Sequence, residues 1–323
     1  MVHGCTGNGP ATAIFRSRAP VPRPWKWTLP IRHHSRATAY LTPAAKPCQT
    51  SGVVRGRSPT IMLFMQSAET AASVIVPTYR EAENIPALVE RTSAAARAAG
   101  ITIEIIIVDD DSQDGTIEVV ERLAAKHPVR LITWTDERGL SSAVLRGFAE
   151  AKYDSLVVMD ADLQHPPEMV PELVAGLGDD ACDFVIGTRY ASGGEIVEDW
   201  PMHRRLVSWG AKQMARPLTP LSDPLSGFFA IPKSVWRRAK RVDPIGYKIA
   251  LELYVKGGCR NPVEVPIKFE TRAAGSSKLT LAEQLRYVRH LWRLYQFRFP
   301  VLVWIVIAVA LLILGGGAWW VML

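Results

Sequence analysis

Short apolar runs that alternate with helical segments are the feature that most constrains the fold of this chain. The runs cover residues 72–76, 103–108, 129–134 and 156–159, and segments with helically spaced apolar residues separate them. Runs of this length predict buried strands, and their alternation with helices predicts parallel pairing. We therefore predict an α/β domain over residues 67–280, built on a mainly parallel sheet.

Acidic side chains follow three of the predicted strands. Glu81 comes after the first strand, Asp110 after the second, and Asp160 and Asp162 after the fourth. Ligands of parallel sheets bind beyond the carboxyl ends of the strands. The acids therefore predict a functional site at that edge of the sheet.

The stretch from Asp160 to His165 predicts a metal site. Two carboxylates one residue apart can converge on a hard divalent cation such as Mg²⁺ or Mn²⁺, and Gln164 can supply a third oxygen. A solvated acidic turn is the alternative, and a lone Asp-x-Asp would favour it. The acids at three strand ends favour the metal. His165 is predicted from strand-end geometry to point away from the motif.

The positive charge of the chain is unevenly distributed. The net charge is +7, but nine Lys and Arg residues precede the first acid, Glu69. Removing those nine leaves about −2 for the rest, so nucleic-acid binding loses its main support. The four cysteines form no Cys-x-x-Cys pair, which argues against a zinc site or a disulfide framework and fits a reducing compartment.

Residues 1–66 contain no acid and show no sustained periodicity. Three interpretations remain open for them: a disordered tail, an organelle transit peptide, or a segment that is not translated, with Met62 or Met65 as the start. We assign this segment no function.

The C-terminal region has the pattern of a membrane anchor. Residues 281–299 interleave arginines with helically spaced apolar residues, which predicts a basic amphipathic helix at an anionic membrane surface. Residues 300–323 carry no charge and are long enough for one transmembrane helix. By the positive-inside rule, the preceding arginines place the catalytic domain on the cytoplasmic side.

Five motifs in order resemble those of the polyprenyl (dolichyl) phosphate mannosyltransferases of glycosyltransferase family 2. They cover residues 76–85, 109–116, 160–166, 187–190 and 223–229. The resemblance implies a GT-A fold, Rossmann-like in its nucleotide-sugar-binding sheet. It also implies an enzyme that transfers mannose from GDP-mannose to a polyprenyl or dolichyl phosphate with inversion. The acceptor oxygen is already an anion, so this reaction needs no general base.

Carried over by position, the resemblance implies roles for individual residues. The nucleotide-sugar site would comprise Pro77, Tyr79, Glu81, Val108, Asp110, Asp160, Ala161, Asp162, Arg272 and Lys278. Asp160, Asp162 and Gln164 would hold the metal, and Arg189, Arg204 and Ser208 would bind the acceptor phosphate, with Arg205 as an alternative to Arg204. Asp160, Asp162 and Arg189 would be the catalytic residues.

The chain departs from the family pattern at two positions. Arg80 stands where many relatives have Asn, and Asp111 where many have Gly or Asn. We interpret both as tolerated, because neither is a proposed ligand.

Three other functions compete with this one. Transfer of glucose from UDP-glucose, or of another sugar, to a polyprenyl phosphate keeps the same fold and stays open. A processive polysaccharide synthase is disfavoured, because residues 213–217 do not match Gln-x-x-Arg-Trp and only one membrane span is predicted. A membrane-tethered nucleotide-sugar-binding module would be expected to lack the metal ligands, which this chain has.

Overall fold

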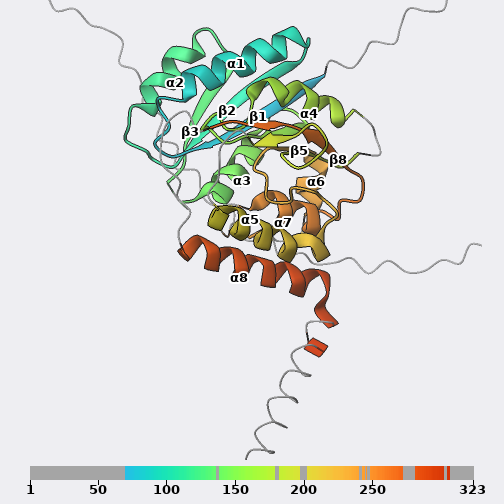
Figure 1. Cartoon of the computed structure of the whole chain (residues 1–323). Helices are drawn as coiled ribbons and strands as arrows, with labels where there is room; N and C mark the ends of the chain where they lie inside the picture. The colour runs from blue at the N-terminus through green and yellow to red at the C-terminus, as the bar shows by residue number, and fades with distance from the viewer. Residues whose placement is uncertain are drawn as a thin grey trace, which may run out of the picture. The chain divides into compact units, whose positions relative to one another are not determined.

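The computed structural model describes residues 70–135, 138–178, 182–196, 202–239, 242–243, 245, 248–271, 281–301 and 304–305 (Figure 1). The interpretations of residues 1–66 concern a segment outside these residues.

The strands and helices follow the predicted alternation. Through the first half they are β1 (Ala71–Thr78), α1 (Ile85–Ala98), β2 (Thr102–Asp109), α2 (Thr116–Ala124), β3 (Val129–Thr133), α3 (Leu140–Glu150), β4 (Ser155–Val158), η1 (Pro167–Met169) and α4 (Val170–Gly176). Then come β5 (Phe184–Thr188), β6 (Glu195–Ile196), α5 (Met202–Ala215), η2 (Arg216–Leu218), β7 (Phe229–Pro232), α6 (Lys233–Arg238), α7 (Ile249–Lys256), β8 (Pro262–Pro266), β9 (Lys268–Phe269) and α8 (Leu281–Arg298).

Seven of these strands form one sheet in the order β3-β2-β1-β4-β7-β5-β8. Only β7 runs antiparallel to its neighbours, so the prediction of a mainly parallel sheet is confirmed. The register pairs Thr78 with Asp109 and Ile75 with Val158. The carboxyl ends of β1, β2 and β4 therefore lie side by side.

Each face of the sheet has its own apolar core. Leu88 of α1 and Leu173 of α4 pack on one face, whereas Phe148 of α3, Leu251 of α7 and Leu291 of α8 belong to the core of the other. Figure 1 shows α1 and α4 on one side of the sheet and α3, α5 and α7 on the other, with α8 beyond α5 and α7. Both faces of the central strands are thus buried, which explains their continuous apolar sequences.

Two local sequence patterns predict features that the structure does not have: the alternation over residues 263–269 predicts one strand, and Asn84 before the first helix predicts a side-chain cap. The alternating segment 263–269 is not one strand but β8 and β9, and β9 pairs with β6 in a separate sheet. Pro266 ends β8, because proline has no N–H to continue the ladder. Asn84 does not cap α1 with its side chain; its amide donates to Glu81 Oε2 at 2.7 Å instead.

The predicted amphipathic helix is α8. Its inner face buries Tyr287, His290, Leu291 and Leu294. The Tyr287 hydroxyl donates to the Ala211 carbonyl, and Tyr295 does the same to Met214, each at 2.7 Å. Among the helices in the described part of the chain, none has the length and apolarity to cross a bilayer. Most of the predicted span 300–323 lies outside the described residues.

Candidate active site

The candidate site lies at the carboxyl edge of the sheet, where the loops after β1, β2 and β4 meet. Pro77 and Val108 are directly paired across β1 and β2, and Tyr79 and Glu81 follow β1. The Met159 N–H donates to the Ile75 carbonyl at 3.1 Å, which extends the β1–β4 pairing up to Asp160. The strand ends predicted from the sequence to form one site are therefore neighbours.

The two acids after β2 have different surroundings. Asp109 is buried, and its carboxylate accepts hydrogen bonds from the Ser112 backbone N–H at 2.8 Å, the Ser112 hydroxyl and the Thr78 hydroxyl at 3.2 Å. It holds the loop together. Asp110 Oδ1 is buried and has no hydrogen-bond partner in the described part of the chain, and burial raises the pKa of this carboxyl. Asp110 is therefore the acid of this loop with unused binding capacity.

The Asp160–Gln164 loop presents oxygen atoms suited to a hard cation. Asp162 Oδ1 accepts the Gln164 N–H at 3.1 Å, and Gln164 Nε2 donates to the Glu270 carbonyl at 3.3 Å. Because Nε2 is tied to the backbone, Oε1 is the ligand atom that Gln164 can offer. No cluster of three His, Cys, Asp or Glu side chains suited to a metal occurs in the described ranges. Two carboxylates and an amide still fit Mg²⁺ or Mn²⁺ that also binds substrate phosphate oxygens.

The prediction that His165 points away from the motif was wrong. Its Nδ1 lies 3.7 Å from Asp160 Oδ2, and the ring packs against Phe228 and Phe269 at centroid distances of 5.3 and 5.4 Å. Burial lowers the pKa of His165 to about 4, so the imidazole is neutral at physiological pH. The imidazole ring therefore lies beside the Asp160 carboxylate.

Arg189, directly after β5, is fixed by an acid 34 residues further along the chain. Its Nε and Nη2 donate to Asp223 Oδ2 and Oδ1 at 2.7 and 2.9 Å. Burial opposes ionisation of both groups, but their mutual attraction keeps the pKa of Arg189 above and that of Asp223 below its usual value. A guanidinium presents its N–H donors in a rigid plane, so the two bonds to Asp223 fix the orientation of the whole group.

Two lysines lie near Arg189 that the sequence did not predict as site residues. Lys248 Nζ donates to the Leu225 carbonyl at 2.8 Å. Burial, followed by repulsion from Arg189, lowers the pKa of Lys248 to about 8, although Asp223 and Asp160 attract its charge. Lys212 of α5 lies over the Tyr190 ring at 4.3 Å. No motif marked either lysine, because each reaches the site only through the fold.

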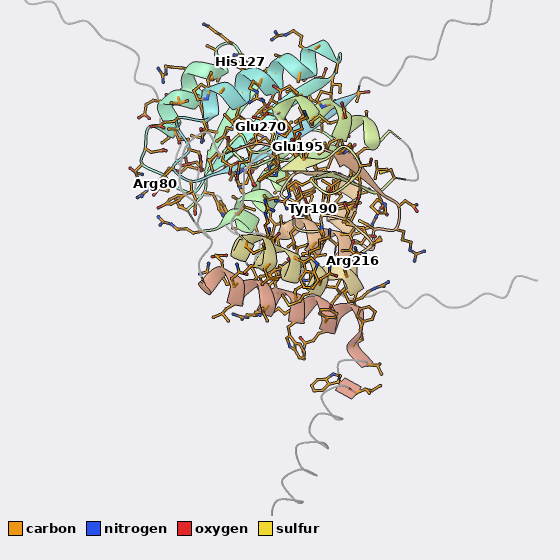
Figure 2. All side chains as sticks on the ribbon, viewed as in Figure 1. Arg80, His127, Tyr190, Glu195, Arg216 and Glu270 are labelled. Carbon is orange, nitrogen blue, oxygen red and sulfur yellow. The ribbon has the colours of Figure 1, made fainter. Side chains whose placement is uncertain are left out.

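Strained backbone occurs in the same loops. Arg80 after β1, Asp111 and Gln113 after β2, and Leu163 after β4 have positive φ angles of 60°, 55°, 54° and 62°. This region favours Gly and Asn. The structure thus gives a physical reason why Asn or Gly suits positions 80 and 111, where this chain departs from the family pattern. Figure 2 labels Arg80 in the first of these loops.

The remaining predicted residues are placed only in part. Ser208 lies on α5 one helical turn before Lys212, so the two share a face. Arg204 belongs to the same helix, but its side chain is outside the described part of the structure. Arg272 and Lys278 are in the segment 272–280, which also lies outside it.

Comparison with known proteins gives a matching family model and several similar relatives. Residues 73–239 match the model of "Glycosyl transferase family 2". The chain is 45% identical over 261 residues to a dolichol-phosphate mannosyltransferase of Mycosarcoma maydis, covering 78% of this chain and 88% of that protein. It is 49% identical over 236 residues to the protein of the same name from Saccharomyces cerevisiae, covering 70% and 88%.

A solved structure shows the fold independently. Glucosyl-3-phosphoglycerate synthase of Mycobacterium tuberculosis, crystallised with Mn²⁺, UDP and glucosyl-3-phosphoglycerate, superimposes with a TM-score of 0.52 at 20% identity. The match covers 72% of this chain and 80% of that one. The likeness confirms the predicted GT-A-like α/β fold.

Proposed function

This chain belongs to glycosyltransferase family 2, and from that premise we propose that it transfers mannose from GDP-mannose to a dolichyl or other polyprenyl phosphate at a membrane surface. One observation supports the proposal most directly: acidic side chains and the buried cations Arg189 and Lys248 lie next to each other at the carboxyl edge of the sheet. Relatives that are 45% and 49% identical and are named dolichol-phosphate mannosyltransferase support the choice of sugar and acceptor.

The donor would bind over β1, β2 and β4. Pro77 and Val108 would flank the base, while the unsatisfied Oδ1 of Asp110 would accept a hydrogen bond from the nucleoside. Asp160, Asp162 and Gln164 would hold a divalent metal, which when bound neutralises charge on the departing diphosphate. Arg272 and Lys278 stay predicted contacts of the donor phosphates.

The acceptor phosphate would bind beside Arg189. The ion pair with Asp223 fixes the plane of the guanidinium, which is the geometry needed to bind a phosphate through parallel N–H bonds. The charge of Lys248 would add to that of Arg189. Ser208 and Arg204 on α5 stay predicted contacts on the other side of this phosphate.

The reaction would be one displacement with inversion. A phosphate oxygen of the acceptor forms the bond to C1 of the sugar, and the bond from C1 to the nucleotide diphosphate breaks. The diphosphate leaves with the electron pair, so no proton is transferred at this step. Burial lowers the pKa of His165 to about 4, which makes its imidazole a weak base and is consistent with a reaction that uses no general base.

Membrane attachment is supported by the outward faces of α5 and α8. Leu285, Val288 and Trp292 of α8 recur at helical spacing and are about half exposed or more. On α5, Leu206 and Trp209 are 65% and 60% exposed. Exposed arginines accompany them on α8, as expected of a helix at an anionic interface. A single span over 300–323 with the catalytic domain on the cytoplasmic side completes the proposal.

The test is a transfer assay on the full chain in detergent micelles. It compares radiolabelled GDP-mannose with UDP-glucose as donors to a synthetic polyprenyl phosphate, with Mg²⁺, Mn²⁺ or a chelator. We expect mannose transfer that stops when the metal is chelated. A preference for UDP-glucose would overturn the assignment of the donor.

A matched pair of variants tests the metal ligands. Asp162→Asn is expected to lose several kcal/mol of transition-state stabilisation, roughly a thousandfold or more in rate. Asp111→Asn, a nearby acid that is not a proposed ligand, is expected to transfer normally. Near-normal turnover by Asp162→Asn would refute the metal site.

A further inference from the structure

A pocket with basic residues in its lining lies away from the candidate active site. Its volume is about 680 Å³, and its lining includes Arg216, Thr219, Tyr254, Arg260 and Arg298. Arg260 comes just before β8, whereas the active-site residues follow the carboxyl ends of the strands. The pocket is therefore at the opposite edge of the sheet. Figure 2 labels Arg216.

The charge of this pocket is of one sign. Three arginines line it, and no Asp or Glu does. All three arginine side chains are exposed, and none pairs with a carboxylate of the described residues. Asp183 lies close to the pocket, and its carboxylate accepts the backbone N–H groups of Arg260 and Asn261 and an N–H of Arg238. The pocket therefore favours an anion.

Two hydroxyl groups also line the pocket, and one of them, Thr219 Oγ1, accepts the Leu221 N–H at 3.2 Å. Thr219 and Tyr254 are 4% and 6% exposed, and both line the pocket. Arginine guanidinium groups often bind phosphate through two parallel N–H···O bonds. A volume of several hundred Å³ also accommodates a phosphodiester with its substituents.

The position of Arg298 indicates where such a phosphate comes from. Arg298 is the last residue of α8, and the exposed apolar residues Val301, Trp304 and Ile305 follow it. This is the point at which the chain enters the predicted membrane span, and aromatic and basic residues there are typical of the headgroup level. We propose that the pocket binds the phosphate of an anionic phospholipid headgroup. The inference rests on the proposed membrane attachment but not on the proposed donor or acceptor.

The experiment measures binding without any sugar donor or polyprenyl phosphate. The full chain in maltoside micelles is titrated by calorimetry with dihexanoyl phosphatidylglycerol, dihexanoyl phosphatidylcholine or inorganic phosphate. We expect saturable binding of phosphatidylglycerol, weakened at least about tenfold in Arg216→Gln/Arg298→Gln because two charged hydrogen-bond donors are lost. Inorganic phosphate that binds as tightly as phosphatidylglycerol would overturn the assignment to a lipid.

A matched variant distinguishes binding in the pocket from an effect of the net charge of the protein. Arg122→Gln/Arg237→Gln removes the same charge from exposed positions outside the pocket and is expected to bind like the wild type. Equal weakening in both double variants, or none in the pocket variant, would overturn the proposal. Thermal unfolding of each variant checks that it is folded. Since the assay contains no substrates, phospholipid binding and mannose transfer can fail independently.

Discussion

Arg189 and Asp223 form a buried bidentate ion pair that joins the end of β5 to the turn before β7. The two N–H···O distances are 2.7 and 2.9 Å, and the Arg189 backbone N–H also points to Asp223 Oδ2 at 3.4 Å. The aromatic ring of Phe269 lies 4.9 Å from the guanidinium carbon. Asp223 therefore fixes the plane and direction of the Arg189 guanidinium.

Asp223→Asn is expected to destabilise the protein by about 3–5 kcal/mol, because it leaves the Arg189 charge buried without its partner. Urea unfolding of the full chain at pH 7 measures this loss. Arg189→Met/Asp223→Leu removes both charges and is expected to recover most of the stability but no transfer. An Asn variant that unfolds like the wild type would contradict the role of the pair.

Arg189→Ala should affect the two substrates unequally. We expect a KM for the polyprenyl phosphate raised at least about tenfold, since a charged hydrogen bond contributes roughly 1.5–3 kcal/mol. The KM for GDP-mannose is expected to change little. Equal losses for both substrates would refute the assignment of Arg189 to the acceptor.

Lys248 is expected to support the same phosphate. Lys248→Met removes a buried positive charge close to Arg189, and we predict a transfer rate about a hundredfold lower. Lys248→Arg keeps the charge and is expected to retain more activity than the Met variant. Lys126→Met, at an exposed position after α2, is the control. A Met variant as active as this control would exclude the proposed role.

Glu104 should make part of the stability dependent on pH. Its carboxylate accepts hydrogen bonds from the Ser73 hydroxyl at 2.6 Å, the Lys152 N–H at 2.5 Å and Arg130 Nε at 3.1 Å. Burial acts in the other direction, but these bonds hold the pKa of Glu104 below its usual 4.5. Because the pKa of Glu104 is lower in the folded state than in the unfolded state, its ionised carboxylate stabilises the protein above pH 4.5. This contribution is lost as the pH falls below that value and the carboxylate becomes protonated.

Glu104→Gln is therefore expected to reduce the free energy of unfolding by about 1–3 kcal/mol at pH 7. The difference from the wild type should shrink at pH 3.5, as measured by urea denaturation. Glu121→Gln, on the exposed side of α2, is expected to change little at either pH. If the difference in unfolding free energy between the wild type and Glu104→Gln grew at pH 3.5, the predicted direction of the pKa shift would be wrong.

The sequence predicted this site as far as the strand ends alone could specify it. Asp110, Asp160 and Asp162 follow buried strands, so their common edge is set by parallel pairing, which apolar periodicity reveals. The partnership of Arg189 with Asp223 could not be predicted, because the two residues are 34 positions apart in the sequence and no local pattern relates them. The direction of His165 is likewise set by the packing of Phe228 and Phe269, and Lys248 enters the site from a different part of the chain.

Gly227 lies so close to Asp160 that a side chain here should disturb the metal loop. A Cβ at position 227 would stand 2.9 Å from Asp160 Oδ2 and 3.2 Å from Oδ1, closer than atoms in van der Waals contact. The Asp160 side chain is 33% exposed and can move aside. We therefore expect Gly227→Ala to alter the position of this carboxylate more than the stability of the fold. Transfer should fall about tenfold, and the Mn²⁺ concentration for half-maximal rate should rise.

The matched control is Gly210→Ala in α5, where an added Cβ would have no neighbour within 4 Å. Alanine favours a helix over glycine by up to about 1 kcal/mol, so this variant should unfold at a higher temperature and transfer normally. A Gly227→Ala enzyme with the metal dependence of the wild type would show that Asp160 tolerates displacement. In that case Asp162 and Gln164 would hold the cation without it.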